Sequence, residues 1–134
     1  MINIEATINA PVEKVWTNYT EPEHITKWNF ASDDWMCPSA TNDLRVGGML
    51  TARMEAKDGS FGFDFGGTYT EVIPNQRLAY TLGDGRKVEV NFSETDGVTT
   101  VTTAFDAETQ NPEEMQRQGW QAILNNFKKH VESN

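Results

Sequence analysis

The sequence has few of the residues that build disulfides, metal sites and nucleophilic centres. Its 134 residues include one cysteine, Cys37, and two histidines, His24 and His130. A single cysteine excludes a disulfide within the chain, and no spacing suggests a zinc site, which needs three or four His, Cys or carboxylate ligands. No phosphate loop, dinucleotide fingerprint or Gly-x-Ser-x-Gly motif is present. We therefore expect neither a metal nor a cofactor.

Basic residues and long hydrophobic runs are also scarce. Eleven Lys and Arg residues stand against twenty Asp and Glu residues, which gives a net charge of −9. This charge repels phosphate backbones and anionic bilayers, so we expect no nucleic acid or membrane partner. No run approaches the length of a membrane span, and residues 1–9 alternate apolar and polar side chains instead of forming a signal peptide. Together with the lone cysteine, this predicts a cytoplasmic protein.

The first part of the chain predicts a strand followed by two short helices. Residues 2–8 alternate apolar and polar side chains, as in a strand with one buried face. Pro11 then opens a helical stripe that includes Tyr19, and a second helical piece follows and ends near Trp28. Residues 29–43 surround an apolar centre with turn-forming residues, so we interpret them as a loop and a candidate lid. Within this loop we expect Cys37 to be packed or idle rather than reactive.

The middle of the chain predicts an antiparallel meander. Gly-Gly and Asp-Gly dipeptides that are typical of hairpin turns occur at residues 47–48, 58–59, 66–67, 84–85 and 96–97. Alternating or threonine-rich segments between them predict strands within residues 50–56, 88–92 and 98–105. The chain shows no linker, repeat or composition shift, and its length suits one hydrophobic core. We expect residues 1–134 to form a single domain.

The chain closes with an amphipathic helix predicted over residues 111–131. Asn111 is suited to cap this helix and Pro112 to open it. One face carries apolar side chains at helical spacing, namely Trp120, Ile123, Leu124, Phe127 and Val131. Gly119 costs about 1 kcal/mol relative to alanine in a helix, so we expect it to face the sheet, for close packing or to leave space for a ligand. A strand-rich chain ending in one long helix predicts an α+β fold, with the sheet wrapped round the helix.

Aromatic residues are dense between the predicted strands. Phe61, Phe63 and Phe65 alternate with small residues and one carboxylate, so a strand here presents three rings on one face. Tyr69 follows after an expected glycine bulge, and Tyr80 lies on the next strand. Such residues either line a ligand cavity or form an ordinary core, and the pattern leaves both interpretations open. The candidate ligand-binding residues are Trp28, Trp35, Met54, Phe63, Phe65, Tyr69, Tyr80 and Gly119.

Candidates for acid–base chemistry are limited to Asp64, His24 and Glu94. If Asp64 faced an apolar cavity, its pKa would rise toward that of a general base. His24 is the histidine that could shuttle a proton. His130 lies among lysines in the last helical turn, where we expect it to cap the helix and contact solvent. For each candidate, a surface position without a catalytic role is the alternative interpretation.

Four segments together carry a resemblance to a known family. They are Trp16 with Pro22-Glu23 and Trp28, then Asp43-Leu44-Arg45-Val46-Gly47-Gly48, then Gly67-Thr68-Tyr69-Thr70-Glu71-Val72, and finally Gly119-Trp120. In this order they resemble the START-related, birch-allergen-like helix-grip superfamily (SRPBCC), in its branch similar to the activator of heat shock protein 90 ATPase. The segment from Phe30 to Gly48 looks like the bacterial stand-alone subgroup called polyketide cyclase-like.

The resemblance implies a curved antiparallel sheet that grips the C-terminal helix, with two short helices closing one end. It also implies a cavity that binds apolar or aromatic small molecules. Many family members carry two adjacent aromatic residues where this chain has Trp28-Asn29, which changes the mouth of that cavity. The heat-shock co-chaperones of this branch carry an additional N-terminal domain that this sequence lacks, so chaperone activation is not expected.

Three functional hypotheses follow. The leading hypothesis is a binding module for a small apolar or aromatic ligand. The alternative is an enzyme that positions a polyketide-like or aromatic substrate for cyclisation or dehydration, through proximity and one acid or base. A co-chaperone-like protein-interaction domain is the least favoured. A carboxylate or histidine buried inside the cavity would favour the enzyme, whereas a lining of apolar groups and hydroxyls would favour binding. An exposed apolar patch on the sheet would favour protein interaction.

Overall fold

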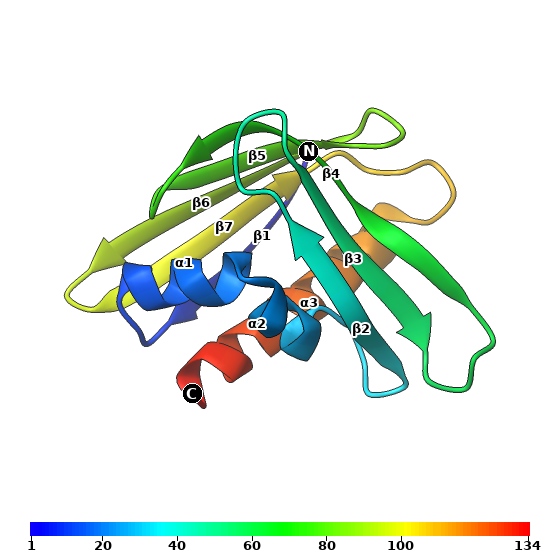
Figure 1. Cartoon of the computed structure of the whole chain (residues 1–134), viewed down its shortest axis with the longest axis horizontal. Helices are drawn as coiled ribbons and strands as arrows, with labels where there is room; N and C mark the ends of the chain where they lie inside the picture. Colours follow the sequence, from blue (N-terminus) through cyan, green and yellow to red (C-terminus); the bar gives the residue numbers. More distant parts are fainter.

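Seven strands form one antiparallel sheet in the computed structural model, which describes all 134 residues (Figure 1). The strands are β1 (Ile2–Ile8), β2 (Trp35–Asn42), β3 (Met49–Ala56), β4 (Gly62–Ile73), β5 (Arg77–Leu82), β6 (Lys87–Thr95) and β7 (Val98–Phe105). Their order across the sheet is β1-β7-β6-β5-β4-β3-β2. From β2 to β7 each strand therefore pairs with its neighbour in sequence, as expected for a meander, and β1 joins at the far edge beside β7.

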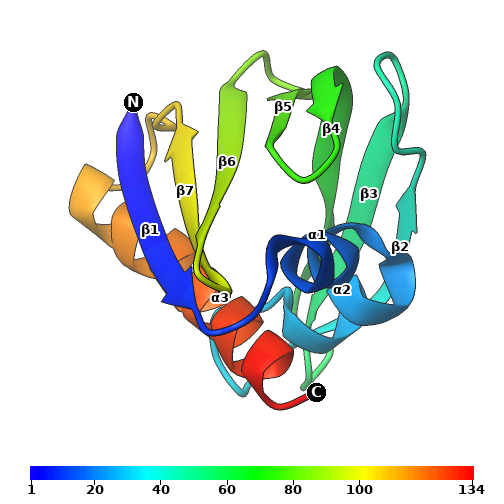
Figure 2. The same ribbon diagram turned by 90° about the vertical axis from the view of Figure 1, so that its left-hand side faces the viewer.

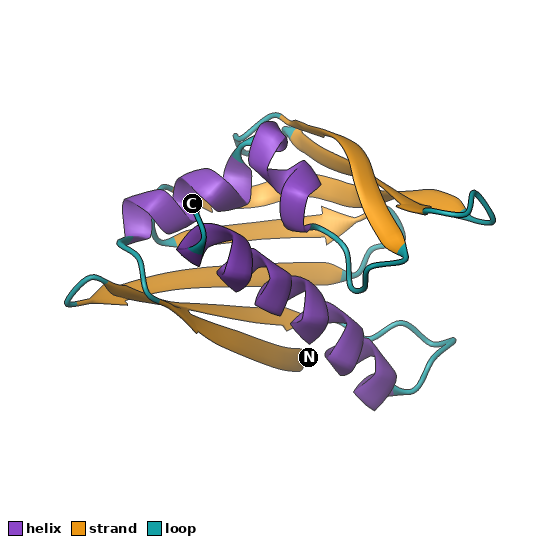
Figure 3. Ribbon diagram, turned by 90° about the horizontal axis from the view of Figure 1, so that it is seen from below, coloured by secondary structure: helices purple, strands orange, loops and turns teal.

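Three helices cover the concave face of this sheet. They are α1 (Val12–Thr20), α2 (Pro22–Trp28) and α3 (Glu113–Glu132). The sheet curls into an arch, with α1 and α2 across one end (Figure 2). Seen from below, α3 runs diagonally beneath the arch, with its C-terminal end beside α1 and α2 (Figure 3). The predicted α+β helix-grip architecture is confirmed. None of these helices is both long and apolar enough to cross a membrane.

Side-chain alternation explains why these segments form strands. In β1 every second residue is buried, and β7 repeats the same pattern beside it. The two strands pair in register from Ile2 opposite Phe105 to Ile8 opposite Thr99, so their buried residues share the concave face. The core between this face and α3 includes Leu124, Phe127 and Val131 of the predicted apolar helix stripe.

Residues 35–42 form the edge strand β2, so the prediction of a loop and lid over 29–43 is wrong for this part. The strand pairs with β3, and its register shifts between Met36 and Ser39, where Pro38 lies. A proline and several turn-forming residues are tolerated because one side of an edge strand needs no ladder hydrogen bonds. Cys37 is buried, and burial raises the pKa of its thiol. The packed interpretation of Cys37 is therefore confirmed.

The bulge in β4 does not lie at the glycines. Gly66 and Gly67 pair regularly with β3, and the register shift falls between Tyr69 and Glu71. A β-carbon at Gly66 would collide with the carbonyl oxygen of Leu50, and one at Gly67 would collide with that of Thr81. These glycines therefore serve close backbone approach between strands.

The start of α3 also differs from the predicted cap. Asn111 lies outside the helix, and no side chain caps the first turn. The buried Gln116 side chain instead folds back, donating to the carbonyl oxygen of Asn111 at 2.8 Å and accepting from the backbone N–H of Glu108 at 2.9 Å. A glutamine inside the helix thus fixes the connection from β7 to α3.

Gly119 does not pack closely against the sheet. A β-carbon at this position would meet no heavy atom within 4 Å outside its own helical surroundings, and Gly119 does not line the cavity described below. The prediction that it serves close packing is therefore wrong. Its neighbour Trp120 makes the close contact instead, stacking on Phe105 with ring centroids 4.0 Å apart.

Replacing Gly119 with alanine is expected to raise the free energy of unfolding by about 0.5 to 1 kcal/mol, because alanine restricts the unfolded chain and meets no obstacle in the folded one. Urea denaturation followed by circular dichroism measures this change. The matched control is Gly66→Ala, which should destabilise because of the collision with β3. A destabilised Gly119→Ala variant would show that α3 is packed more tightly at this point.

Candidate ligand-binding cavity

A cavity of about 180 Å³ lies between the concave face of the sheet and α3. Strands β1, β3, β4, β5 and β7 contribute to its wall, together with all three helices. Its lining consists of Ile4, Tyr19, Ile25, Trp28, Asn29, Leu50, Met54, Phe63, Phe65, Tyr69, Tyr80, Thr103, Trp120, Ile123 and Leu124. Asn29 and Thr103 are the only members that are not hydrophobic or aromatic. The cavity therefore suits a mainly apolar molecule.

Six of the eight candidate ligand-binding residues lie in this lining, namely Trp28, Met54, Phe63, Phe65, Tyr69 and Tyr80. Gly119 and Trp35 do not. Trp35 packs at the edge of the sheet, with its ring 6.1 Å from that of Phe61 and 6.0 Å from that of Phe63. Sequence reasoning did not select Tyr19 or Thr103. The helical stripe predicted burial for Tyr19, but not that it borders the cavity. The threonine-rich pattern of residues 98–105 predicted a strand without identifying its buried face.

Trp28 forms a rigid part of the wall where α2 meets α3. Its indole Nε1 donates to the backbone carbonyl of Asn18 at 2.9 Å. The indole packs against Phe127, with ring centroids 4.8 Å apart, and against Tyr19 at 5.2 Å. The hydrogen bond satisfies the one polar group of this buried ring, so Trp28 presents only apolar surface to the cavity.

Tyr69 joins the sheet to the helices beside the cavity. Its hydroxyl donates to Oδ1 of Asn42 at 2.8 Å, and Nδ2 of Asn42 donates to the carbonyl of Thr20 at 2.7 Å. Burial raises the pKa of Tyr69 to about 12. Tyr80 lies directly opposite on β5, with the two rings 5.9 Å apart. Two phenol rings therefore stand side by side in the wall.

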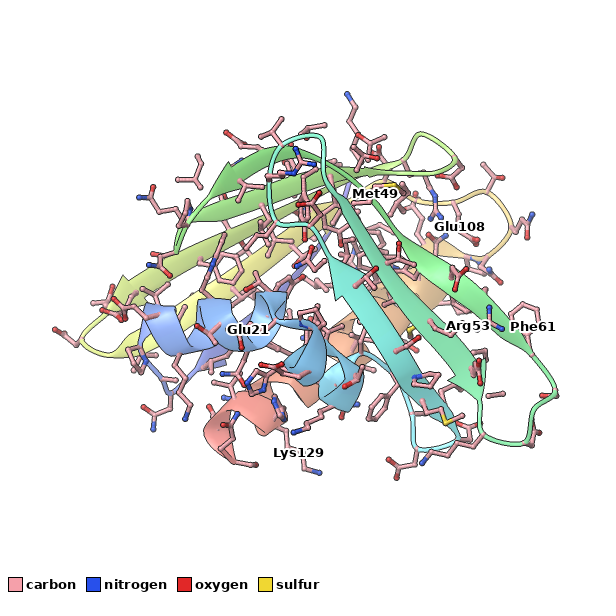
Figure 4. All side chains as sticks on the ribbon, in the orientation of Figure 1. Glu21, Met49, Arg53, Phe61, Glu108 and Lys129 are labelled. Carbon is pink, nitrogen blue, oxygen red and sulfur yellow. The ribbon has the colours of Figure 1, made fainter.

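The cavity reaches the surface beside Phe63, which is 40% exposed although it lines the interior. Phe61 extends the apolar surface outward and is 60% exposed. Figure 4 shows Phe61 at the free end of the β3–β4 hairpin, far from Glu21 and Lys129 at the helical end. The aromatic rings of Trp35, Phe61 and Phe63 form a cluster beside the cavity, which we call the rim.

None of the three acid–base candidates borders the cavity. Asp64 lies on the outer face of β4, where its side chain is 66% exposed and 3.6 Å from Nη1 of Arg53. Asp64 therefore does not face the apolar cavity, as a general base there would have to. Glu94 accepts a hydrogen bond from the backbone N–H of Val12 at 2.7 Å, which supplies the missing cap of α1.

His24 lies on α2, and its Nδ1 is 3.0 Å from Nε2 of His130 on α3. His130 therefore contacts another histidine instead of serving only as a solvated cap. Glu21 and Glu23 bring carboxylate oxygens close to His24, and these three ligand atoms lie within 4.8 Å of one another. Both carboxylates are exposed and His24 already contacts His130, so this cluster gives no basis for a metal centre.

Acidification is expected to destabilise the fold through His130. The pKa of His130 lies below its ordinary value of 6.5 because of burial first, and then because of His24, Lys27 and Lys14. The unfolded chain therefore takes up this proton at higher pH than the folded chain, and stability is lost as the pH falls through the folded-state pKa.

Thermal unfolding at about pH 7.5 and about pH 5 measures this dependence. The His24→Gln variant removes one source of repulsion, so its loss of stability on acidification should be smaller than that of the unmodified protein. Equal losses in the two proteins would contradict coupling between the two histidines.

Comparisons with known proteins agree with this architecture. The chain matches the model of the family described as Activator of Hsp90 ATPase homolog 1-like protein over residues 9–132. The solution structure of an AHSA1-like protein from Aeromonas hydrophila is 44% identical, with a TM-score of 0.90, and the match covers 98% of this chain and 93% of that one. Chr148 from Cytophaga hutchinsonii is 51% identical, with a TM-score of 0.85 and coverage of 99% and 92%.

A more distant neighbour shares the fold alone. Protein CV1439 from Chromobacterium violaceum is 24% identical, with a TM-score of 0.87, and the match covers 99% of this chain and 98% of that one. No curated protein gives a significant match. Because the family model spans nearly the whole chain, this protein belongs to the Activator of Hsp90 ATPase homolog 1-like family.

Proposed function

We propose that this protein binds a small apolar or aromatic molecule in the cavity between the sheet and α3. The observation that carries the proposal is the lining, in which aliphatic and aromatic side chains surround a space of about 180 Å³ that opens beside Phe63. Transfer of an apolar molecule from water into such a space is favourable in proportion to the area removed from water. The exposed aromatic rings at the rim offer an apolar path by which a ligand enters the cavity.

The lining supports binding over acid–base catalysis. It contains no carboxylate, imidazole, amine or thiol, and its polar groups are hydroxyls, the amide of Asn29 and the indole N–H groups of two tryptophans. Cyclisation or dehydration needs at least one group that exchanges a proton near neutral pH. Burial raises the pKa of Tyr19, Tyr69 and Tyr80, so these phenols stay protonated and exchange protons poorly at that pH.

Fluorescence of N-phenyl-1-naphthylamine, an uncharged apolar probe, tests the proposal. The probe should bind, and Tyr69→Ala should weaken binding by at least about 1 kcal/mol through lost aromatic contact. The matched variants His24→Ala, Asp64→Asn and Glu94→Gln should bind the probe nearly as well as the unmodified protein, because these side chains lie outside the cavity. Absence of probe binding would refute the proposal. The unmodified protein could instead turn over a cyclisable substrate. If one of the three matched variants lost this turnover and still bound the probe, the enzyme hypothesis would replace the binding proposal.

A further inference from the structure

Two phenol hydroxyls in the cavity wall have no hydrogen-bond partner within the protein. Tyr19 on α1 and Tyr80 on β5 both line the cavity, and neither hydroxyl takes part in any hydrogen bond of the structure. Every fully enclosed side-chain oxygen or nitrogen does have a partner. The two unpartnered hydroxyls are therefore not fully enclosed, and the cavity is the space that both side chains border. Tyr69 differs, because Asn42 already accepts from its hydroxyl.

We propose that the hydroxyls of Tyr19 and Tyr80 hold the polar end of the ligand, and that this end is an uncharged oxygen acceptor such as a ketone carbonyl. The inference rests on the proposed binding function and adds the ligand's chemical class to it. A polar group that leaves water without a new hydrogen bond loses free energy, so an apolar ligand whose oxygen meets these donors is favoured over one without an acceptor.

The buried surroundings of the two phenols keep them protonated, so they act as hydrogen-bond donors. Burial is the main cause that raises the pKa of Tyr80 well above its ordinary value, and the neighbouring Tyr19 and Tyr69 add to it. Burial likewise raises the pKa of Tyr19, with Tyr69 adding to the shift. Both hydroxyls therefore stay protonated at neutral pH and can donate hydrogen bonds to an acceptor.

The same wall disfavours a charged ligand. The lining contains no lysine, arginine or histidine to pair with a carboxylate, and the chain as a whole carries a net charge of −9. Burial of an unpaired anion in apolar surroundings is costly. The favoured ligand is therefore a neutral molecule whose flat, apolar body contacts rings such as Trp28 and Phe65.

A pair of bicyclic probes separates this inference from the general binding function. Tetralin is a hydrocarbon, and 1-tetralone differs from it by one carbonyl group in place of a methylene. The dissociation constant of each is measured by displacement of N-phenyl-1-naphthylamine. The ratio of the two constants is then compared among the unmodified protein, Tyr19→Phe, Tyr80→Phe and the double variant. Phenylalanine keeps the ring, so tetralin affinity reports in each variant whether the cavity itself is preserved.

We expect the double variant to lose about tenfold in its preference for 1-tetralone over tetralin, and each single variant about threefold, as two neutral hydrogen bonds allow. Dividing by the tetralin constant of the same protein corrects each ratio for any change in the cavity itself. An unchanged ratio in the double variant, with tetralin still bound, would overturn the inference and leave the binding function intact. Failure of N-phenyl-1-naphthylamine to bind would overturn the binding function together with the inference. Binding of that probe without displacement by either bicyclic molecule would overturn the inference alone.

Discussion

Replacing Trp28 with alanine is expected to lower the free energy of unfolding by about 3 to 5 kcal/mol, the usual cost of deleting a large buried ring. The indole is buried and contacts the rings of Tyr19 and Phe127. The substitution also leaves the carbonyl of Asn18 without its donor. Urea denaturation followed by far-ultraviolet circular dichroism measures the loss.

Trp35→Ala is the matched control for this substitution. Trp35 is only half-buried, makes no side-chain hydrogen bond and lies at the edge of the sheet, outside the cavity. Its replacement should cost no more than about 2 kcal/mol. Equal losses for the two tryptophans would contradict the assignment of Trp28 to the core and of Trp35 to the rim.

A tryptophan in place of Met54 is expected to fill the cavity and weaken binding of N-phenyl-1-naphthylamine by about tenfold or more, because the ligand must then displace the new ring. Met54 is buried and lines the cavity from β3, directly opposite Phe63 of β4. The fold should survive with a loss of about 1 to 3 kcal/mol, the usual cost of overpacking.

Met36→Trp provides the matched control, because it introduces the same side chain on the other side of the sheet. Met36 lies opposite Glu55, whose side chain pairs with Arg53 on the outer face. Probe binding should remain unchanged in this variant. Similar loss of binding in both variants would show that the probe binds elsewhere or that tryptophan disturbs the sheet in general.

Periodicity was sufficient to predict most of the architecture. The alternation of residues 2–8 and the apolar stripe of residues 120–131 each have one buried face, and such patterns determine both the type of element and its orientation. The same logic placed Phe63 and Phe65 on the concave side, because alternation leaves Asp64 on the other face once residues 62–66 form a strand.

Features that depend on contacts distant in sequence could not be predicted in this way. Residues 35–42 lack strand-like alternation, and they form β2 because the backbone of β3 offers them a partner. The isolated helical glycine at 119 gave no indication of what lies around it. Tyr19 appeared as one more apolar residue of a helix stripe, and its place in the cavity follows from how α1 lies against the sheet.

The most direct test of the binding function is a titration with N-phenyl-1-naphthylamine that follows the indole N–H signals of the four tryptophans by nuclear magnetic resonance. Trp28 and Trp120 line the cavity, whereas Trp16 packs against Phe92 outside it and Trp35 lies at the rim. Binding in the cavity predicts saturable shifts of the Trp28 and Trp120 signals and an unchanged Trp16 signal. Shifts confined to Trp35, or no shift at a probe concentration that saturates its fluorescence, would contradict it.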